Sequence, residues 1–268
     1  MNYLRDAKVR FLSEQSWIFH LISATHLTHF NSLCDLVNSM SVHHKEKGLV
    51  AIGDDEKIVI IDSLQQKQRV FTRLHSNLVS KIAFKPNTSG EVASCGFDYM
   101  YNAWDYRTGR TKFKINSSEW LAERSHQSEN GVTQLTNPPF FHDFAFVNKG
   151  KHSVCVLGDG HIVLVDNSQG NCIARRKGHE GMITNVDSKG IGSNICITGG
   201  VDRVVKVWNI NEGEINPMGG FAHDAKINYV KCLNHRNENP CLSVADLGKV
   251  FIADTSTDGL ISVVEAIR

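Results

Sequence analysis

Two sets of hydrogen-bonding residues share one spacing in this chain. An imidazole, a hydroxyl, a carboxylate and an indole follow one another at gaps of 19, 4 and 6 residues, and the same groups return 104 residues later at identical gaps. Each group can donate or accept a hydrogen bond. The sets are His75, Ser94, Asp98 and Trp104, then His179, Thr198, Asp202 and Trp208. Because four coincident positions make a repeat, the sets mark a structural unit and argue against an enzyme.

Three short strands are predicted to position the residues of each set. In the first copy they cover Ser80–Phe84, Glu91–Ser94 and Tyr99–Trp104, and turn residues occupy 86–90 and 96–98. β-Branched and small apolar residues fill the strands, whereas glycine, asparagine, aspartate and serine fill the breaks. The second copy, residues 179–209, follows the same pattern.

Weaker copies of the pattern appear once the period is known. The strand-ending dipeptides are Ile61-Asp62, Trp104-Asp105, Val165-Asp166, Trp208-Asn209 and Ala253-Asp254, at steps of 43, 61, 43 and 45 residues. A period of about 40–45 residues that ends in Trp-Asp is the signature of a β-propeller blade. The long step indicates a loop inserted at about 107–136. The copies without tryptophan are expected to rest on apolar packing alone.

The two sets resemble the tetrads of the WD-repeat family. This resemblance implies that tryptophan and serine or threonine lie on inner strands, aspartate in the turn between them, and histidine in the preceding loop. It also implies that the four side chains form one hydrogen-bonded chain inside the blade. Such a network is favourable only when it is complete, because a buried aspartate that loses its histidine is left unpaired.

The expected fold is an all-β WD-repeat propeller over residues 34–268, with five four-stranded blades. The blades are predicted at about 34–66, 75–108, 137–168, 178–211 and 222–256. Propellers of this family most often have seven blades, and residues 1–33 match no blade pattern. That segment either forms a poor sixth blade or closing strand, or the chain lacks two N-terminal blades. We favour the second interpretation, an incomplete seven-bladed ring.

Composition excludes several classes of function. The 268 residues include 29 basic and 28 acidic side chains, so no global field favours nucleic acid or an anionic membrane. No apolar run is long enough to span a bilayer. Seven cysteines without a CxxC pair favour reduced thiols in an intracellular protein of the nucleus or cytoplasm. Metal-ligand, nucleotide-binding and nucleophile motifs are missing, so we predict no metal, no cofactor and no catalytic residue.

The order of further segments is similar to one member of the WD-repeat family. These segments are 74–86, 134–140, 177–186 and 223–254. The resemblance implies a non-catalytic adaptor, the substrate receptor of a cullin-RING ubiquitin ligase. Such receptors dock onto the ligase's damage-specific DNA-binding adaptor through Trp-Asp-x-Arg, here Trp104-Asp105-Tyr106-Arg107. Arg107 is expected on the narrow face of the propeller, where a guanidinium can make bidentate contacts that lysine cannot.

Other interpretations stay open at this point. A general WD-repeat scaffold in a chromatin or RNA-processing complex is the leading alternative. A propeller enzyme is a distant third, since a fold alone never excludes activity. In the insertion, Trp120 is either an aromatic anchor for a protein partner or a side chain folded back on the propeller, and Ser118 could cap a short helix over Glu119–Arg124. The basic runs 107–114 and 175–177 are interpreted as solvated faces.

Overall fold

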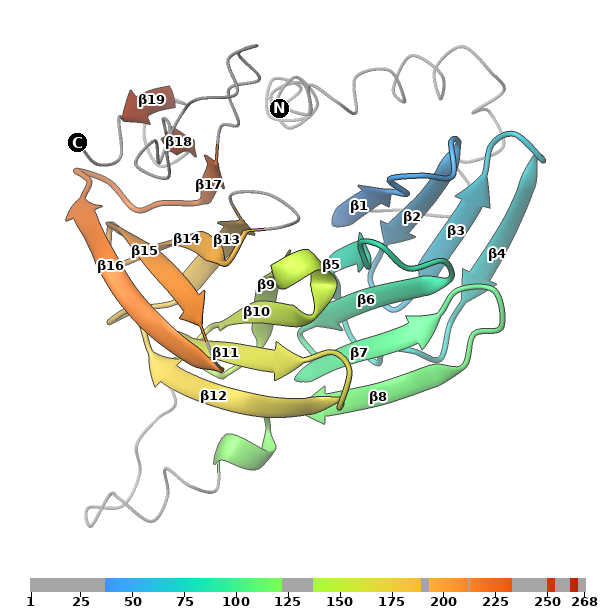
Figure 1. Ribbon diagram of the computed structural model, residues 1–268, viewed down its shortest axis with the longest axis horizontal. Coiled ribbons are helices and arrows are strands. Elements are labelled where there is room, and N and C mark those ends of the chain that lie inside the picture. Colours follow the sequence, from blue (N-terminus) through green and yellow to red (C-terminus); the bar gives the residue numbers. More distant parts are fainter. Residues whose placement is uncertain are drawn as a thin grey trace.

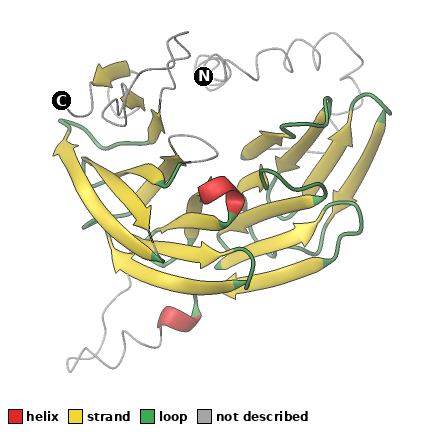
Figure 2. Ribbon diagram, in the orientation of Figure 1, coloured by secondary structure: helices red, strands yellow, loops and turns green. Residues whose placement is uncertain are grey.

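The computed structural model describes residues 37–121, 137–188, 193–211, 213–232, 250–253 and 261–264. This part of the chain is nearly all β (Figure 2). Its strands are β1 (Ser39–Val42), β2 (Leu49–Gly53), β3 (Ile58–Asp62), β4 (Lys67–Phe71), β5 (Val79–Phe84), β6 (Glu91–Gly96), β7 (Met100–Asp105), β8 (Thr111–Asn116), β9 (Phe141–Val147), β10 (His152–Leu157), β11 (His161–Asp166), β12 (Asn171–Lys177), β13 (Ile183–Ser188), β14 (Ile195–Gly200), β15 (Val204–Asn211), β16 (Glu214–Ala222), β17 (Tyr229–Cys232), β18 (Val250–Ala253) and β19 (Ile261–Val264). A 3-10 turn, η2 (Asn148–Gly150), follows β9.

The strands form antiparallel sheets in which each strand pairs with the next along the chain. Four sheets have four strands each, β1–β4, β5–β8, β9–β12 and β13–β16, and the described part of the fifth is β17–β19. The sheets follow one another around an arc, with the first strand of each sheet on its inner side (Figure 1). Neighbouring inner strands contact one another from sheet to sheet. This is the arrangement of propeller blades, and the five sheets are called blades 1 to 5 below.

The outer strands lie beyond the predicted ends of the blades. Three of the predicted strands lie within two residues of β5, β6 and β7, but β4, β8, β12 and β16 each follow the strand-ending dipeptide. In particular, β8 lies inside the segment 107–136 that the sequence suggested was an inserted loop. The outer strand KQRVF is mostly exposed, and TKFKIN is half exposed and carries only two apolar residues, Phe113 and Ile115. Apolar periodicity, the main sequence signal for a strand, is therefore weak in them.

The core lies between the blades. Trp104 of blade 2 is fully buried in one cluster with Ile58 and Ile60 of blade 1. In the same way, Trp208 of blade 4 packs in a cluster with Ile162 and Leu164 of blade 3. The apolar face of each blade is therefore covered by its neighbour, as repeat architectures require. The cysteines predicted in inner strands, Cys95, Cys155 and Cys196, are fully buried and carry no disulfide.

Side chains on the inner strands bridge from one blade to the next. The hydroxyl of Ser39 accepts the Ile82 backbone N–H at 3.1 Å, and the hydroxyl of Thr184 donates to the Ile227 carbonyl at 2.7 Å. An inner strand would otherwise present unpaired backbone groups at a sheet edge. The remaining inner-strand bridges involve Ser41, Ser80, Asp143, Asn185 and Asp187.

The longest of these bridges crosses four blades. Asp143 of β9 lies 3.0 Å from the ammonium of Lys81 on β5, and its other oxygen accepts the Val186 backbone N–H at 3.1 Å. The same oxygen accepts the side-chain amide of Asn185 on β13, which in turn accepts the Val230 N–H of β17 at 2.8 Å. Burial lowers the pKa of Lys81, but the adjacent Asp143 carboxylate outweighs it and holds that pKa above its ordinary value. Lys81 therefore stays charged.

Candidate protein-docking site

The first tetrad forms one hydrogen-bonded chain. Asp98, in the β6–β7 turn, lies 2.9 Å from Nδ1 of His75, and Nε2 of that ring lies 2.8 Å from the Ser94 hydroxyl. The indole of Trp104 donates to the same hydroxyl at 3.2 Å. Because the carboxylate can only accept, Nδ1 carries the histidine proton and Nε2 accepts from the hydroxyl. Burial raises the pKa of Asp98, but the hydrogen bond and charge of His75, together with the backbone N–H groups of Ser76 and Met100, outweigh it and hold that pKa below its ordinary value.

The second tetrad repeats this geometry in blade 4. His179 Nδ1 lies 2.9 Å from Asp202, and its Nε2 lies 2.7 Å from the Thr198 hydroxyl. Trp208 donates to that hydroxyl at 2.8 Å. Thr198, like the serine of the first tetrad, is fully buried. A nucleophile must reach its substrate, whereas these hydroxyls are buried inside the hydrogen-bonded chain of the blade.

Blade 3 retains part of a tetrad, and the expectation that it rests on apolar packing alone was wrong. Asp159 precedes Val165 by six residues, as Asp98 precedes Trp104. Its buried carboxylate lies 3.0 Å from Nδ1 of His161 and accepts that residue's backbone N–H at 3.1 Å. The equivalent position of the aspartate could have been found from the spacing, but its histidine comes from the following strand instead of the preceding loop.

Arg107 lies in a turn that the preceding aspartate fixes. In the β7–β8 turn, Asp105 accepts the backbone N–H groups of Arg107 and Thr108, both at 2.8 Å. Side chains of Asp form such turns readily. The Arg107 side chain is 54% exposed, and its guanidinium lies 5.6 Å from the ring centroid of Tyr106. Trp104, by contrast, is fully buried in the core, so its side chain cannot itself touch a partner.

Glu46, from the neighbouring blade, pairs with Arg107. Its carboxylate lies 3.1 Å from the guanidinium and accepts the Tyr106 hydroxyl at 3.2 Å. The loop that carries it, between β1 and β2, is held by His43, whose Nδ1 accepts the Glu46 backbone N–H at 2.8 Å. Sequence reasoning missed Glu46 because it lies 61 residues before Arg107 in a different blade.

The strand order decides which face carries Arg107. Successive strands of a blade run in opposite directions, so the β6–β7 and β7–β8 turns lie at opposite ends of the blade. Asp98 lies in the first of these turns and Arg107 in the second. Arg69 of blade 1 donates to the Arg107 carbonyl, which ties the two blades together at this face. The candidate docking face is therefore opposite the end that carries the His75–Asp98 pair.

Comparison with known proteins agrees with the tetrad geometry. No family model matches the chain. It is 25% identical over 241 residues to the WD repeat-containing protein 53 homolog of Dictyostelium discoideum, an alignment that covers 83% of this chain and 66% of the relative. This chain has a WD-repeat propeller fold. It spans just under two thirds of the relative's length, and the similarity supports a protein-interaction scaffold for this chain.

Trp120 packs onto the propeller instead of standing exposed. Its ring lies 6.3 Å from the Phe141 ring, and the Arg175 guanidinium lies 5.0 Å from its centroid. A helix begins at Glu119, as expected, and is described as far as Leu121. Residues 122–136 of the insertion lie outside the described residues. The Ser118 hydroxyl donates to Asn116. Because Trp120 is half-buried against the propeller, we do not propose it as an anchor for a partner.

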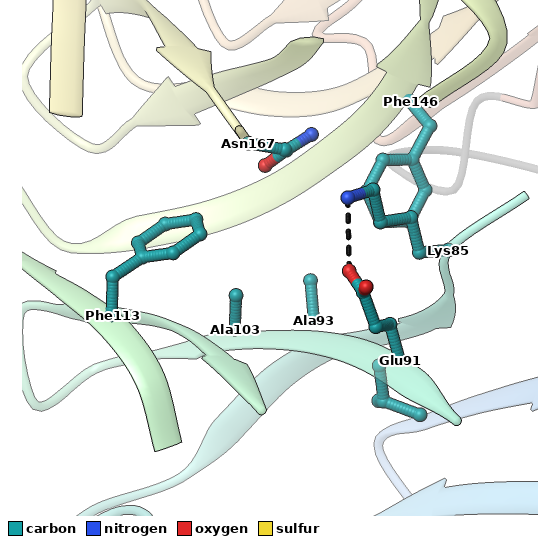
Figure 3. Close-up of a pocket in the computed structure, with 8 residues that line it drawn as sticks. Lys85, Glu91, Ala93, Ala103, Phe113, Phe146 and Asn167 are labelled. Atoms are coloured by element: carbon teal, nitrogen blue, oxygen red, sulfur yellow. Dashed lines mark hydrogen bonds and ion pairs between the residues drawn. The ribbon is translucent and has the colours of Figure 1, made fainter. Parts of the chain in front are cut away.

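The cavity between blades 2 and 3 is too small for a ligand larger than water. Figure 3 shows the cavity there, of about 10 Å³, beside the Lys85–Glu91 ion pair of 2.9 Å. A cavity of that size accommodates about one water molecule.

In the part of the chain that the structure describes, no group of three or more histidine, cysteine or acidic residues is arranged to hold a metal ion. None of the helices in that part is long and apolar enough to cross a membrane.

The propeller is expected to lose stability as the pH falls from 7 to 5. Burial holds the pKa of His43, His142 and His179 below the ordinary value of 6.5. When the pH falls below 6.5, these histidines take up protons in the unfolded chain more readily than in the folded chain. Unfolding is therefore favoured as the pH falls. Melting temperatures measured by circular dichroism across this range check the prediction. A melting temperature that rises or stays constant toward pH 5 would contradict it.

Proposed function

We propose that this WD-repeat chain is a substrate-recognition adaptor of a cullin-RING ubiquitin ligase, acting inside the cell in the nucleus, the cytoplasm or both. In this proposal Arg107 docks onto the ligase's damage-specific DNA-binding adaptor, and another surface holds the substrate. The observation that carries the proposal is the exposed Arg107 guanidinium on a turn that Asp105 holds rigid. A preorganised side chain loses little freedom when it binds a partner.

The Glu46 contact indicates what Arg107 recognises. Glu46 is 42% exposed at its side chain and supplies a carboxylate to the guanidinium at 3.1 Å. A carboxylate on the partner could replace it, because guanidinium and carboxylate pair through matched donors and acceptors. The same pair also favours the competing function, a general scaffold in another complex, since an arginine already paired within the chain needs no partner.

The test is co-purification of the ligase adaptor with tagged wild-type and Arg107→Ala chains. We expect the adaptor to be depleted about tenfold with Arg107→Ala, as for loss of one charged contact at an interface rim. Arg107→Lys is expected to rescue binding only in part, because lysine cannot make bidentate contacts. Arg110→Ala, in the same exposed loop, is the matched control and should retain the adaptor.

Two outcomes would contradict the adaptor proposal. One is equal recovery of the adaptor with wild-type and Arg107→Ala chains. The other is absence of the adaptor from every sample when each chain melts cooperatively, which would favour the general scaffold. Glu46→Gln separates the roles of the pair. If Glu46 competes with the partner, this variant should recover more adaptor than wild type does.

A further inference from the structure

A groove lies between blades 3 and 4 that the docking proposal does not use. It has a volume of about 490 Å³ and is lined by Arg176 and Lys177 of β12, Lys206 of β15, and Phe221 of β16. The two outer strands that border it, β12 and β16, contact each other at the outside of the arc (Figure 1). Pockets that hold ligands are typically about 300–1,000 Å³. We call this feature the basic groove.

The charges of the basic groove are all positive. No aspartate or glutamate of the described chain lines it. The guanidinium of Arg176 donates to the Ile215 carbonyl at 3.1 Å, and the ammonium of Lys177 donates to the Asp159 carbonyl at 2.7 Å. The third cation, Lys206, likewise donates to a backbone carbonyl. A carbonyl holds each head group in place but offsets no charge, so the groove attracts anions.

The hollow of the basic groove arises from small residues. Gly178, Gly219 and Gly220 line it without side chains, and Trp208 lies beneath with 2% of its surface exposed. On β16 the register shifts opposite Trp208, and Met218 projects there, 49% exposed. Within the described chain, β16 pairs only with β15 and forms the edge of its sheet. Edge strands can add an extended peptide through backbone hydrogen bonds.

We propose that the basic groove binds an extended acidic segment of a partner protein. Its three cations donate to three different backbone carbonyls, which suits charges spaced along a peptide. A single-stranded nucleic acid would need aromatic faces for its bases to stack upon. Trp208 is buried and Phe221 is half-buried, so the groove lacks that platform. This site is separate from the Arg107 turn and does not rest on the proposed adaptor function.

The test measures binding of labelled peptides to the full 268-residue chain by fluorescence polarisation. The probe is a short peptide in which glutamate alternates with valine, and its matched control carries glutamine in place of glutamate. We expect the glutamate peptide to bind, to weaken as salt is raised, and to bind about tenfold more weakly to Lys177→Glu. Lys206→Met, which keeps most of the aliphatic stem, should weaken binding in the same direction.

Lys114→Glu is the control variant, because it makes the same charge change on β8, the outer strand of blade 2. It should bind the glutamate peptide as wild type does. Thermal melts establish that each variant is folded. The proposal is overturned if Lys177→Glu and Lys206→Met both fold and bind like wild type, or if the glutamine peptide binds equally well. A single-stranded oligonucleotide that binds more tightly than the peptide, and depends on Lys177, would assign the groove to nucleic acid instead.

Discussion

Replacing Asp143 by alanine is expected to lower the free energy of unfolding by about 3 kcal/mol, because removing one partner of a buried charged pair strands the other. The carboxylate is 5% exposed and serves three partners on two other blades, Lys81, Asn185 and Val186. Without it, a buried backbone N–H and a buried amide lose their acceptor, and each such loss costs about 1–3 kcal/mol. Lys81 contributes less than a fully buried cation would, since its side chain is 31% exposed.

Urea denaturation of the purified chain measures this effect, with two variants as controls. Asp143→Asn keeps one acceptor oxygen for the Val186 N–H, although its amide NH2 replaces the oxygen that faces Lys81. It should therefore be milder than Asp143→Ala. Lys81→Met, which leaves the carboxylate its hydrogen bonds from Asn185 and Val186, should be milder still. If Asp143→Ala unfolds at the same urea concentration as wild type, the bridge across the inner strands does not stabilise the propeller.

Removing Asp202 or His179 from the second tetrad is expected to destabilise the protein by about 1–3 kcal/mol, the penalty for a buried polar group without its partner. His179 is 1% exposed and Thr198 fully buried, so water cannot readily replace the missing group. Asp202→Ala would leave His179 Nδ1 without its acceptor at 2.9 Å. His179→Ala would leave both the carboxylate and the Thr198 hydroxyl without the ring.

A double-mutant cycle separates this network from simple loss of packing. Because both residues belong to one hydrogen-bonded chain, the Asp202→Ala and His179→Ala double variant should be much less destabilised than the sum of the two single variants. Asp224→Ala, at an exposed position of the following loop, should melt like wild type. Additive single effects would show that the tetrad does not act as a unit.

The sequence by itself determined the blade and its tetrads. The strands, the turns and the four hydrogen-bonding residues of each tetrad lie within about one repeat, so the spacing of residue types reports them directly. Arg107 could be located for the same reason, since it follows Trp104 in the same repeat. The outer strands were not recognised, because they hold few apolar residues and their apolar periodicity is weak.

Contacts between blades were decided only by the tertiary structure. Glu46 meets Arg107, Lys81 meets Asp143, and three cations from β12 and β15 line one groove. The Trp120 ring, which the sequence left either exposed or folded back, packs against Phe141 and lies beside Arg175. Each of these contacts joins residues of different repeats, whose relative positions depend on how one blade stacks on the next. The pattern within a repeat reflects local strand geometry, whereas these pairings arise only when neighbouring blades bury their apolar faces against each other.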